Sequence, residues 1–279
     1  MAREYAKPVK PGQKVSLAKY EADDTGGLER SEGERRLEEL DRELGELQEL
    51  LYAAGQHGVI LLLQGLDTSG KDGTIKRVLM NVNPAGCHIV AFKAPTAQEL
   101  ARDFLWRIHA GVPAKGQLGV FNRSHYEDVL IVRVHELVPE KVWRKRYGQI
   151  NDFERLLADT NTILIKCYLH ISKAEQEERL LEREQDVTKA WKLSVQDWIE
   201  RRSWDEYTAA YNDALGECST EHAPWHIIPA DKKWYRNLAV AQLLVDALRP
   251  YREQWLERLN RIGQRELLAI QEARAERQA

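Results

Sequence analysis

The sequence predicts an α/β protein in three layers, with a central parallel sheet covered by helices on both faces. Short apolar runs typical of buried strands alternate with helical patterns along most of the chain. A glycine-containing loop directly follows the first of these runs, which predicts a ligand site at the carboxyl ends of the strands. The 279 residues suffice for one large domain, or at most two, with a substantial core.

The chain is expected to begin with an extended arm over residues 1–30, where Pro, Gly, Lys and Asp are mixed without apolar periodicity. A helix should follow, because Ser31 and Glu34 have the spacing of a capping box. Leucines then recur every three or four residues from Leu37 to Leu51. This stripe is shorter than the three to four heptads that indicate a coiled coil, so we expect it to dock against the body of the domain.

Five apolar runs are predicted to form the sheet, at residues 59–64, 89–92, 118–121, 163–169 and 225–228. Capping boxes predict helices after Thr96, with Glu99, and after Ser172, with Glu175. The buried faces should contain Leu100, Phe104 and Ile108 in the helix after Thr96, and Ile150, Phe153 and Leu157 in a helix that begins near Pro139.

Residues 31–249 are expected to form one domain, within which the charged segment 172–211 makes a helical excursion over the sheet. Asp231 is predicted to cap the next helix, which should run to about Leu248. Residues 250–279 have a helical pattern with Trp255 on its apolar side. We expect this last helix to pack on a partner subunit, which makes the chain a homo-oligomer.

The composition excludes several classes of protein. There are 41 Lys and Arg against 44 Asp and Glu, so the overall field attracts no polyanion and a general nucleic-acid binder is not expected. No stretch approaches the roughly 18 apolar residues of a membrane span, and the first residues lack the apolar core of a secretory signal. The 3 cysteines are far apart and lack metal-binding spacing. We therefore expect a cytoplasmic protein with no membrane partner.

The segment GLDTSGKD, residues 65–72, fits the pattern G-x-x-x-x-G-K of a phosphate-binding loop between a buried strand and a helix. Its glycines let backbone N–H groups point inward, and the helix N-terminus adds the positive end of its dipole. Lys71 should reach a phosphate as a mobile point charge. The loop residues expected to contact phosphate are Gly65, Ser69, Gly70, Gly73 and Thr74.

Two carboxylates make this loop unusual. Asp72 stands where a Ser or Thr hydroxyl commonly touches Mg²⁺, and Asp67 adds a second carboxylate to a cradle for anions. Asp67 would repel a phosphate unless a cation lay between them, so we expect bound Mg²⁺. The alternative is that Asp72 only stabilises the first turn of the helix, where a carboxylate interacts favourably with the helix dipole.

A second group of charged residues follows the strand at 118–121. Proteins with phosphate loops commonly end such a strand with an Asp that orients magnesium, but this chain has Asn122 there. The acids that could reach the ion therefore come later, namely Asp128 and less directly Glu127. Arg123 has the planar fork that suits bidentate contact with phosphate.

Four ordered motifs, GLDTSGKDG, FNRSHYEDVLIVRVH, KAWK and APWHIIPADKKWYRN, together resemble the polyphosphate kinase 2 family. The FNRSHYED variant is similar to the class III members. The resemblance spans roughly residues 37–248. It implies a thymidylate-kinase-like phosphate-loop kinase fold with a mobile helical lid, and Mg²⁺-dependent transfer of phosphoryl groups from inorganic polyphosphate to nucleoside mono- and diphosphates. AMP and ADP would then be converted to ADP and ATP.

The same resemblance implies roles for particular residues. Asp67, Lys71 and Asp72 match the catalytic set of the phosphate loop, and Arg123 matches the arginine of the second motif. Asp128 is the candidate second magnesium ligand beside Asp67. The remaining residues expected to contact substrates, most of them within a lid similar to residues 176–204, are Arg77, Asn122, Glu127, Arg133, Arg179, Arg183, Lys189, Lys192 and Arg201, with Arg183 as a catalytic cation.

Two other functions are open from the sequence. An ATP-dependent nucleoside monophosphate kinase would suit the same strands and loop, but would use ATP better than polyphosphate. A non-catalytic nucleotide sensor is disfavoured. A protein that only binds nucleotides has no use for carboxylates directed at the oxygens of a phosphoryl group during transfer. We expect His125 to be structural, since an acceptor phosphate that is ionised at neutral pH needs no general base. The tryptophans, among them Trp191 and Trp204, are expected to be core residues.

Overall fold

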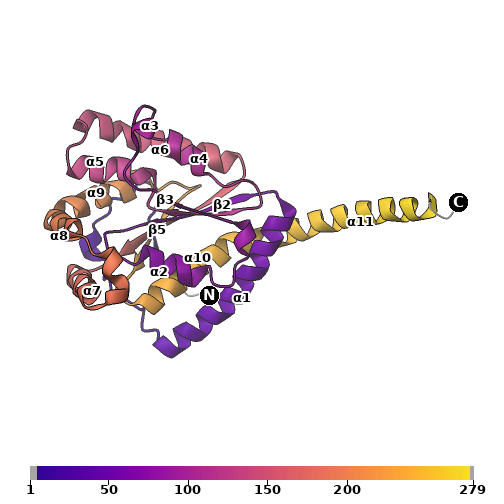
Figure 1. Ribbon diagram of the computed structural model, residues 1–279, viewed down its shortest axis with the longest axis horizontal. Helices are drawn as coiled ribbons and strands as arrows, with labels where there is room; N and C mark the ends of the chain where they lie inside the picture. Colours follow the sequence, from indigo (N-terminus) through magenta and orange to yellow (C-terminus); the bar gives the residue numbers. More distant parts are fainter. Residues whose placement is uncertain (1–4, 277–279) are drawn as a thin grey trace.

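The computed structural model describes residues 5–276 and has a six-stranded sheet between two layers of helices (Figure 1). The strands are β1 (Lys7–Pro8), β2 (Gly58–Gln64), β3 (Cys87–Ala91), β4 (Leu118–Asn122), β5 (Thr162–His170) and β6 (Trp225–Pro229). They lie in the order β1-β6-β5-β2-β4-β3, and all neighbours from β6 to β3 are parallel. The predicted three-layer α/β fold and its five strands are confirmed.

The sequence did not predict strand β1 in the N-terminal arm. It pairs antiparallel with β6, with Lys7 opposite Ile227, so one edge strand of the otherwise parallel sheet runs the other way. The arm is held further along by Leu17, whose side chain is buried and whose backbone N–H donates to Asn212 Oδ1 at 2.8 Å.

The helices were expected on both faces of the sheet, and they lie there. They are α1 (Arg30–Ala54), α2 (Lys71–Val78), α3 (Ala97–Leu100), α4 (Trp106–Gly111), α5 (Ile131–Val134), α6 (Glu140–Asp159), α7 (Lys173–Gln185), α8 (Val195–Glu200), α9 (Trp204–Glu217), α10 (Lys233–Leu248) and α11 (Arg252–Glu276). Successive side chains of β2 alternate between the two layers. Leu61 and Leu63 pack on the side of α1, α2 and α10, whereas Ile60 and Leu62 pack on the side of α6 and α9.

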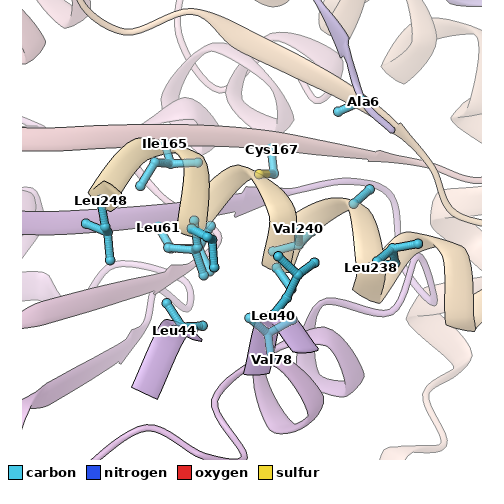
Figure 2. Packing of buried hydrophobic residues seen from close by; sticks show 14 of the residues in the cluster. Ala6, Leu40, Leu44, Leu61, Val78, Ile165, Cys167, Leu238, Val240 and Leu248 are labelled. Atoms are coloured by element: carbon cyan, nitrogen blue, oxygen red, sulfur yellow. The ribbon is translucent and has the colours of Figure 1, made fainter. Parts of the chain in front are cut away.

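The leucine stripe of α1 docks against the body, as predicted. The five leucines of the stripe, Leu37, Leu40, Leu44, Leu47 and Leu51, are buried, and α1 packs along α10 and α11. Figure 2 shows Leu40 and Leu44 facing the cluster that contains Val240 of α10. The predicted start at a Ser31 capping box is wrong, because α1 already begins at Arg30 after Glu29 and no side chain caps it.

The helix predicted after Thr96 is only partly correct. Thr96 and Glu99 form the expected capping box, but α3 then ends at Leu100 and α4 begins only at Trp106. Between them the Asp103 side chain accepts a hydrogen bond from the Leu105 backbone N–H at 3.0 Å, an alternative to helical pairing that Asp favours. Leu100 is consequently 69% exposed and does not share a buried face with Ile108.

The charged segment 172–211 is helical, as predicted, and contains α7, the 3₁₀ segment Val187–Lys192, α8 and the first half of α9. The Ser172 side chain caps α7 by accepting from the Glu175 backbone N–H at 3.2 Å, as expected. Asp231 does not cap α10, whose N-cap is Lys232. Its carboxylate instead accepts from the Ser172 backbone N–H at 2.8 Å, and so links β6 to the start of α7.

Helix α11 begins against the body and then extends away from it (Figure 1). Trp255 is fully buried and donates to His57 Nδ1 at 3.0 Å. Across residues 5–276 no helix is at once long enough and apolar enough to cross a membrane.

A buried ionic network holds the segment that follows β4. Lys166 of β5 and Glu154 of α6 are both fully buried, with 2.6 Å between Lys166 Nζ and Glu154 Oε2. Glu154 Oε1 also accepts from Tyr126 at 2.8 Å and lies 3.1 Å from His125 Nε2. His125 is therefore a structural residue of this network, as expected.

Replacing Lys166 with Met is expected to lower the free energy of unfolding by about 3–5 kcal/mol, because Glu154 is left buried without its charge partner. The double variant Lys166→Met/Glu154→Leu should lose less than the single variant, since it removes the buried charge as well. Urea unfolding of both variants measures this. A single variant as stable as the wild type would show that the ion pair contributes nothing.

Candidate active site

The phosphate loop connects β2 to α2 in the predicted position. Gly65 has φ 153° and Gly70 has φ 101°, backbone conformations that favour glycine. A Cβ at Gly65 would lie 2.7 Å from the backbone oxygen of Leu169, and one at Gly70 would collide with the Arg236 guanidinium. The loop can therefore curl tightly against β5 and α10 only with glycine at both positions.

Lys71 lies at the base of this loop as the first residue of α2. Its side chain is buried, and its Nζ donates to the backbone oxygens of Gly65 at 2.6 Å and Leu66 at 3.2 Å. Burial, and then the neighbouring charge of Arg123, lower the pKa of Lys71 to about 8. An anion that entered the loop would favour the charged form of this lysine.

Both predicted loop carboxylates are paired with cations. Asp67 Oδ1 accepts from Arg123 Nη2 at 2.7 Å. Asp72 accepts from Lys192 Nζ at 2.7 Å and from Asn122 Nδ2 at 2.8 Å. The hydrogen bond from Lys192 is the main reason that the pKa of Asp72 is lowered. The loop, the end of β4 and the lid thus meet through these side chains.

Two site residues have strained backbones. Thr68 has φ 62° and Arg123 has φ 64°, in the left-handed region that residues other than glycine seldom occupy. Such conformations cost about 1–3 kcal/mol each and are concentrated at functional sites. At Arg123 the turn is held by its own backbone N–H, which donates to Leu63 O at 3.1 Å. In this conformation the Arg123 guanidinium pairs with Asp67.

Two clefts meet at the Asp67–Arg123 ion pair, because these are the two residues that line both of them. The first cleft has a volume of about 510 Å³, and its charged lining residues are Asp67, Lys71, Asp72, Lys93, Arg123, Arg183 and Lys192. The second has a volume of about 230 Å³, and the aromatic residues Trp204, Tyr207 and Tyr211 line it together with Glu127, Asp197, Glu200 and Arg201.

The predicted cations Arg179 and Arg201 connect α7 to the phosphate loop. Arg179 is buried, and its guanidinium donates to the backbone oxygens of Thr68 at 2.9 Å and of Ala230 and Asp231 at 2.8 Å. Arg201 donates to Gln176 Oε1 at 3.0 Å, and Gln176 in turn donates to Asp67 O at 3.1 Å. Arg183 lines the first cleft and pairs with Asp197 at 3.0 Å.

Seven predicted site residues lie outside the linings of both clefts. Three are Ser69, Thr74 and Arg179, and the other four are charged residues that pair with side chains elsewhere. Arg77 pairs with Asp41 of α1, Arg133 pairs with Asp213 at 2.7 Å, and Lys189 pairs with Asp186 at 2.8 Å. Asp128 faces Arg146 of α6, with 3.1 Å between Oδ1 and Nη1, and its burial raises its pKa. This geometry does not bring Asp128 to the cleft that contains Asp67, so it gives no support to the predicted pair of magnesium ligands.

Other residues that shape the site were missed. Arg236 donates to the backbone oxygen of Ser69 at 3.2 Å, although the motif that contains it suggested no role. Lys93, the second residue after β3, lines the first cleft. Trp204 was expected in the core but lines the second cleft, and Trp191 is 78% exposed. No local sequence signal distinguishes these residues from ordinary surface or core residues. Their position in the folded chain identifies them.

The comparisons with known proteins decide the family. The family model of polyphosphate kinase 2 matches residues 27–255, most of the chain. The chain belongs to the polyphosphate kinase 2 family. It is 52% identical over 242 residues to an AMP/ADP-polyphosphate phosphotransferase of Meiothermus ruber, which covers 86% of this chain and 91% of the relative. It is 42% identical over 250 residues to an ADP-polyphosphate phosphotransferase of Rhodopseudomonas palustris, with 85% and 86% covered.

A solved structure agrees with this assignment to the polyphosphate kinase 2 family. The crystal structure of polyphosphate kinase 2 from Arthrobacter aurescens is 44% identical in sequence and superposes with a TM-score of 0.82, covering 87% of this chain and 91% of that one. The predicted resemblance to the family and the phosphate-loop kinase fold are confirmed.

The lowered pKa of Lys71 predicts a pH dependence of phosphate binding. Since the pKa of Lys71 is lowered to about 8 and a bound anion raises it again, affinity for polyphosphate should fall as the pH rises above about 8. NMR of ¹³C-lysine-labelled protein measures this, because one εCH₂ signal, absent from Lys71→Met, should titrate near pH 8. If every lysine signal titrated above pH 10, the predicted environment of Lys71 would be wrong.

Proposed function

We propose that this chain transfers phosphoryl groups from inorganic polyphosphate to AMP and ADP. The observation that carries the proposal is the meeting of two chemically different clefts at Asp67 and Arg123 beside Lys71. Transfer between two substrates requires their reacting groups to be held in line, and such a junction offers that placement. The names of the relatives from Meiothermus ruber and Rhodopseudomonas palustris support the same activity.

The first cleft suits the polyphosphate chain. Inorganic polyphosphate has no base, so charge and backbone donors alone can hold it. Lys71, Lys93, Arg123, Arg183 and Lys192 supply five cations to this cleft, against the two carboxylates of Asp67 and Asp72. Binding through these cations should weaken with salt, as for other linear polyanions.

The second cleft suits the nucleoside part of the acceptor. Trp204, Tyr207 and Tyr211 provide flat aromatic surfaces on which a base can stack, and Glu127 and Glu200 provide carboxylates that can accept from hydroxyl and amino groups. Carboxylates would repel a polyphosphate chain, which makes this cleft the less favourable one for the donor. The acceptor phosphate would then point toward Arg123.

The chemistry needs little more than positioning and positive charge. The terminal phosphate of the acceptor has a pKa of about 6 if it behaves like other phosphomonoesters, so it is mostly ionised at neutral pH and attacks without a general base. Lys71 and Arg123 would neutralise the oxygens of the transferred group, and the loop N–H groups would hold it in place. The burial of His125 against Glu154 agrees with the absence of a basic catalyst.

The residues of the junction fit a Mg²⁺ ion. Mg²⁺ is usually bound through one or two carboxylates together with substrate phosphates and water, and it would neutralise charge on those phosphates. Asp67, which lines both clefts, would hold it, and Asp72 is the second carboxylate of the first cleft. No group of three His, Cys, Asp or Glu side chains among the described residues forms a complete metal cage, which agrees with a site completed by substrate. The Ser69 hydroxyl in the same loop is buried and has no hydrogen-bond partner, which suits a loop that binds a polar ligand.

The cellular location follows from the substrates. We propose a cytoplasmic enzyme, since nucleoside phosphates are abundant there and the three cysteines, Cys87, Cys167 and Cys218, are free thiols, as a reducing compartment favours.

The activity is tested with purified protein, long-chain polyphosphate, Mg²⁺ and either AMP or ADP, with ATP followed over time. We expect ADP and ATP from AMP, and ATP from ADP, at rates that exceed those with ATP as the donor to AMP. If no ATP forms from polyphosphate, or if ATP is the better donor to AMP, the proposal fails and an ATP-dependent nucleoside monophosphate kinase becomes the better account.

The assignment of substrates to clefts is tested by two variants. Lys192→Ala removes a cation from the first cleft and should raise the KM for polyphosphate about tenfold, whereas Tyr207→Ala should raise the KM for AMP by a similar factor. Lys189→Ala is the matched control, because Lys189 lies on the same lid segment and pairs with Asp186 outside both clefts. Interchanged effects on the two KM values would reverse the assignment.

A further inference from the structure

The backbone carbonyl groups of the phosphate loop, from Gly65 to Gly70, all accept hydrogen bonds from donors in the protein. Lys71 Nζ donates to the oxygens of Gly65 and Leu66, and the Thr74 backbone N–H donates to Gly70 O at 2.9 Å. The three oxygens between them, those of residues 67–69, accept from side chains that belong to other elements. These side chains therefore control how the middle of the loop is oriented.

Three buried side chains make these contacts, and none of them lines the first cleft. They are Gln176 and Arg179 of α7 and Arg236 of α10, which donate in that order to the backbone oxygens of residues 67, 68 and 69, at 3.1, 2.9 and 3.2 Å. The loop residues on either side of Ser69 do line the first cleft. The carbonyl of Ser69 is thus directed away from that cleft.

The direction of each carbonyl fixes the direction of the next N–H group. In a trans peptide the C=O of one residue and the N–H of the following residue point in opposite directions, and no peptide among the described residues is cis. Because the Ser69 carbonyl points to the buried Arg236, the Gly70 N–H points the opposite way, toward the first cleft that Gly70 lines. An N–H group so directed can donate to a bound phosphate.

Arg236 also places an unpaired positive charge next to the loop. Its side chain is 3% exposed, and its hydrogen bonds go to the neutral oxygens of Ser69 and Asn237. Burial, and then the nearby charge of Arg179, lower the pKa of Arg236. A buried charge without a counter-ion is costly, and an anion in the loop would supply the missing negative charge. The guanidinium lies directly against Gly70, since a Cβ there would collide with it.

We infer that Arg236 is a positioning residue of the phosphate loop, which turns the Gly70 N–H toward a bound phosphate by holding the Ser69 carbonyl away from the first cleft. Gln176 and Arg179 hold the two preceding carbonyls in the same way, so Arg179 acts through the loop backbone. The inference rests on the proposed function only in taking the first cleft to bind phosphates, whichever phosphoryl donor the enzyme uses.

The peptide that Arg236 holds can be observed by NMR, because residues 69 and 70 are the only Ser-Gly pair in the sequence. In protein labelled with ¹³C at serine carbonyls and ¹⁵N at glycine, the amide signal coupled to ¹³C belongs to Gly70 alone. Pyrophosphate with Mg²⁺ should move this amide proton downfield in the wild type, and Arg236→Met should largely abolish the shift. Arg236→Lys should keep most of it, since a lysine can still donate to Ser69 O. No shift in the wild type, or an equal shift in Arg236→Met, would overturn the inference.

Isothermal titration calorimetry with pyrophosphate and Mg²⁺ measures the effect on affinity. Arg236→Met and Arg236→Ala should each raise Kd at least about tenfold, the effect expected for loss of a charged hydrogen bond, whereas Arg236→Lys should stay within about threefold of the wild type. Arg146→Met is the matched control, because Arg146 is also partly buried and donates to a backbone oxygen, that of Asp128 at 2.9 Å, outside the linings of both clefts.

A purely structural role of Arg236 would give a different result. The unfolding midpoints of Arg236→Met and Arg146→Met would then both fall, with Kd for pyrophosphate unchanged or changed equally in the two variants, and either outcome would contradict the inference. In the kinetic assay Arg236→Met should raise the KM for polyphosphate and leave the KM for AMP within about twofold of the wild type, because Gly70 lines only the first cleft. An equal rise of both KM values would also count against it.

Failure of the proposed function would be recognised separately. If polyphosphate yields no ATP, the proposed activity is wrong, but the calorimetric and NMR results would still show the dependence on Arg236, since a kinase that uses ATP needs the same loop for its phosphates. If polyphosphate yields ATP but pyrophosphate affinity does not depend on Arg236, the activity holds and the positioning role is wrong.

Discussion

Lys71→Ala is expected to lower kcat for ATP formation from polyphosphate by about 10²–10³-fold, or about 2.7–4 kcal/mol of transition-state stabilisation. Lys71 is the buried cation at the base of the phosphate loop, with its Nζ directed at the loop carbonyls of Gly65 and Leu66. When a phosphate occupies the loop, this charge lies where negative charge must be neutralised. Steady-state kinetics with saturating polyphosphate and ADP measures the loss.

Two further variants separate the charge from the packing of Lys71. Lys71→Met keeps most of the apolar stem and should lose as much activity as Lys71→Ala, with a smaller effect on the unfolding midpoint. Lys76→Ala, on the exposed side of the same helix, should keep nearly full activity. An equal loss in the Lys76 and Lys71 variants would mean that α2, rather than the buried cation, is what matters.

Arg123→Ala is expected to cause a loss of similar size, about 10²–10³-fold in kcat. Arg123 lines both clefts and pairs with Asp67 at 2.7 Å, and the Glu127 and Asp67 carboxylates raise its pKa although burial alone would lower it. Its loss removes the cation at the junction and leaves the Asp67 carboxylate to repel the phosphates. The same kinetic assay, with AMP and with ADP as acceptor, measures the effect.

The backbone of Arg123 provides a matched control. Since φ at this position is 64°, Arg123→Gly relieves strain that Arg123→Ala retains. Both variants should be equally inactive, but the glycine variant should have the higher unfolding midpoint. Arg123→Lys keeps the charge without the planar fork and should lie between the wild type and Arg123→Ala in kcat. If Arg123→Gly retained wild-type kcat, the guanidinium would have no part in the reaction.

The sequence was most informative where residue pattern and local geometry coincide. The runs that became β2 and β5 are short, apolar and bounded by polar residues, and buried strands with that pattern need no tertiary information to be recognised. The phosphate loop was readable for the same reason, because its glycines meet a backbone requirement that the structure shows at Gly65 and Gly70.

The sequence was least informative where a residue distant in the chain determines the partner of a side chain. Asp128 belongs to a motif of the family, but Arg146 of α6 holds its carboxylate, and nothing in the local sequence indicates that partner. Likewise Asp41 of α1 pairs with Arg77. The predicted cap at Asp231 failed because its carboxylate bonds to the backbone of Ser172, a residue far away in sequence.

The second cleft could not have been read from the sequence at all. Its walls come from the segment after β4, from α8 and from α9, which converge only in the folded lid. Trp204 and Tyr211 have the helical spacing of core residues, and a base-stacking surface and a core contact look alike in a sequence. The acidic residues of the cleft, among them Glu200, look like a solvated helix face until the fold turns them inward.

A crystal structure of the protein with AMP, pyrophosphate and Mn²⁺ tests most directly whether two substrates meet at Asp67 and Arg123. We expect pyrophosphate in the first cleft within hydrogen-bonding distance of Lys71 Nζ, the adenine among Trp204 and Tyr207, and the anomalous peak of Mn²⁺ beside Asp67. Phosphate bound away from the loop, both ligands in the same cleft, or Mn²⁺ beside Asp128 instead of Asp67 would contradict this account of the site.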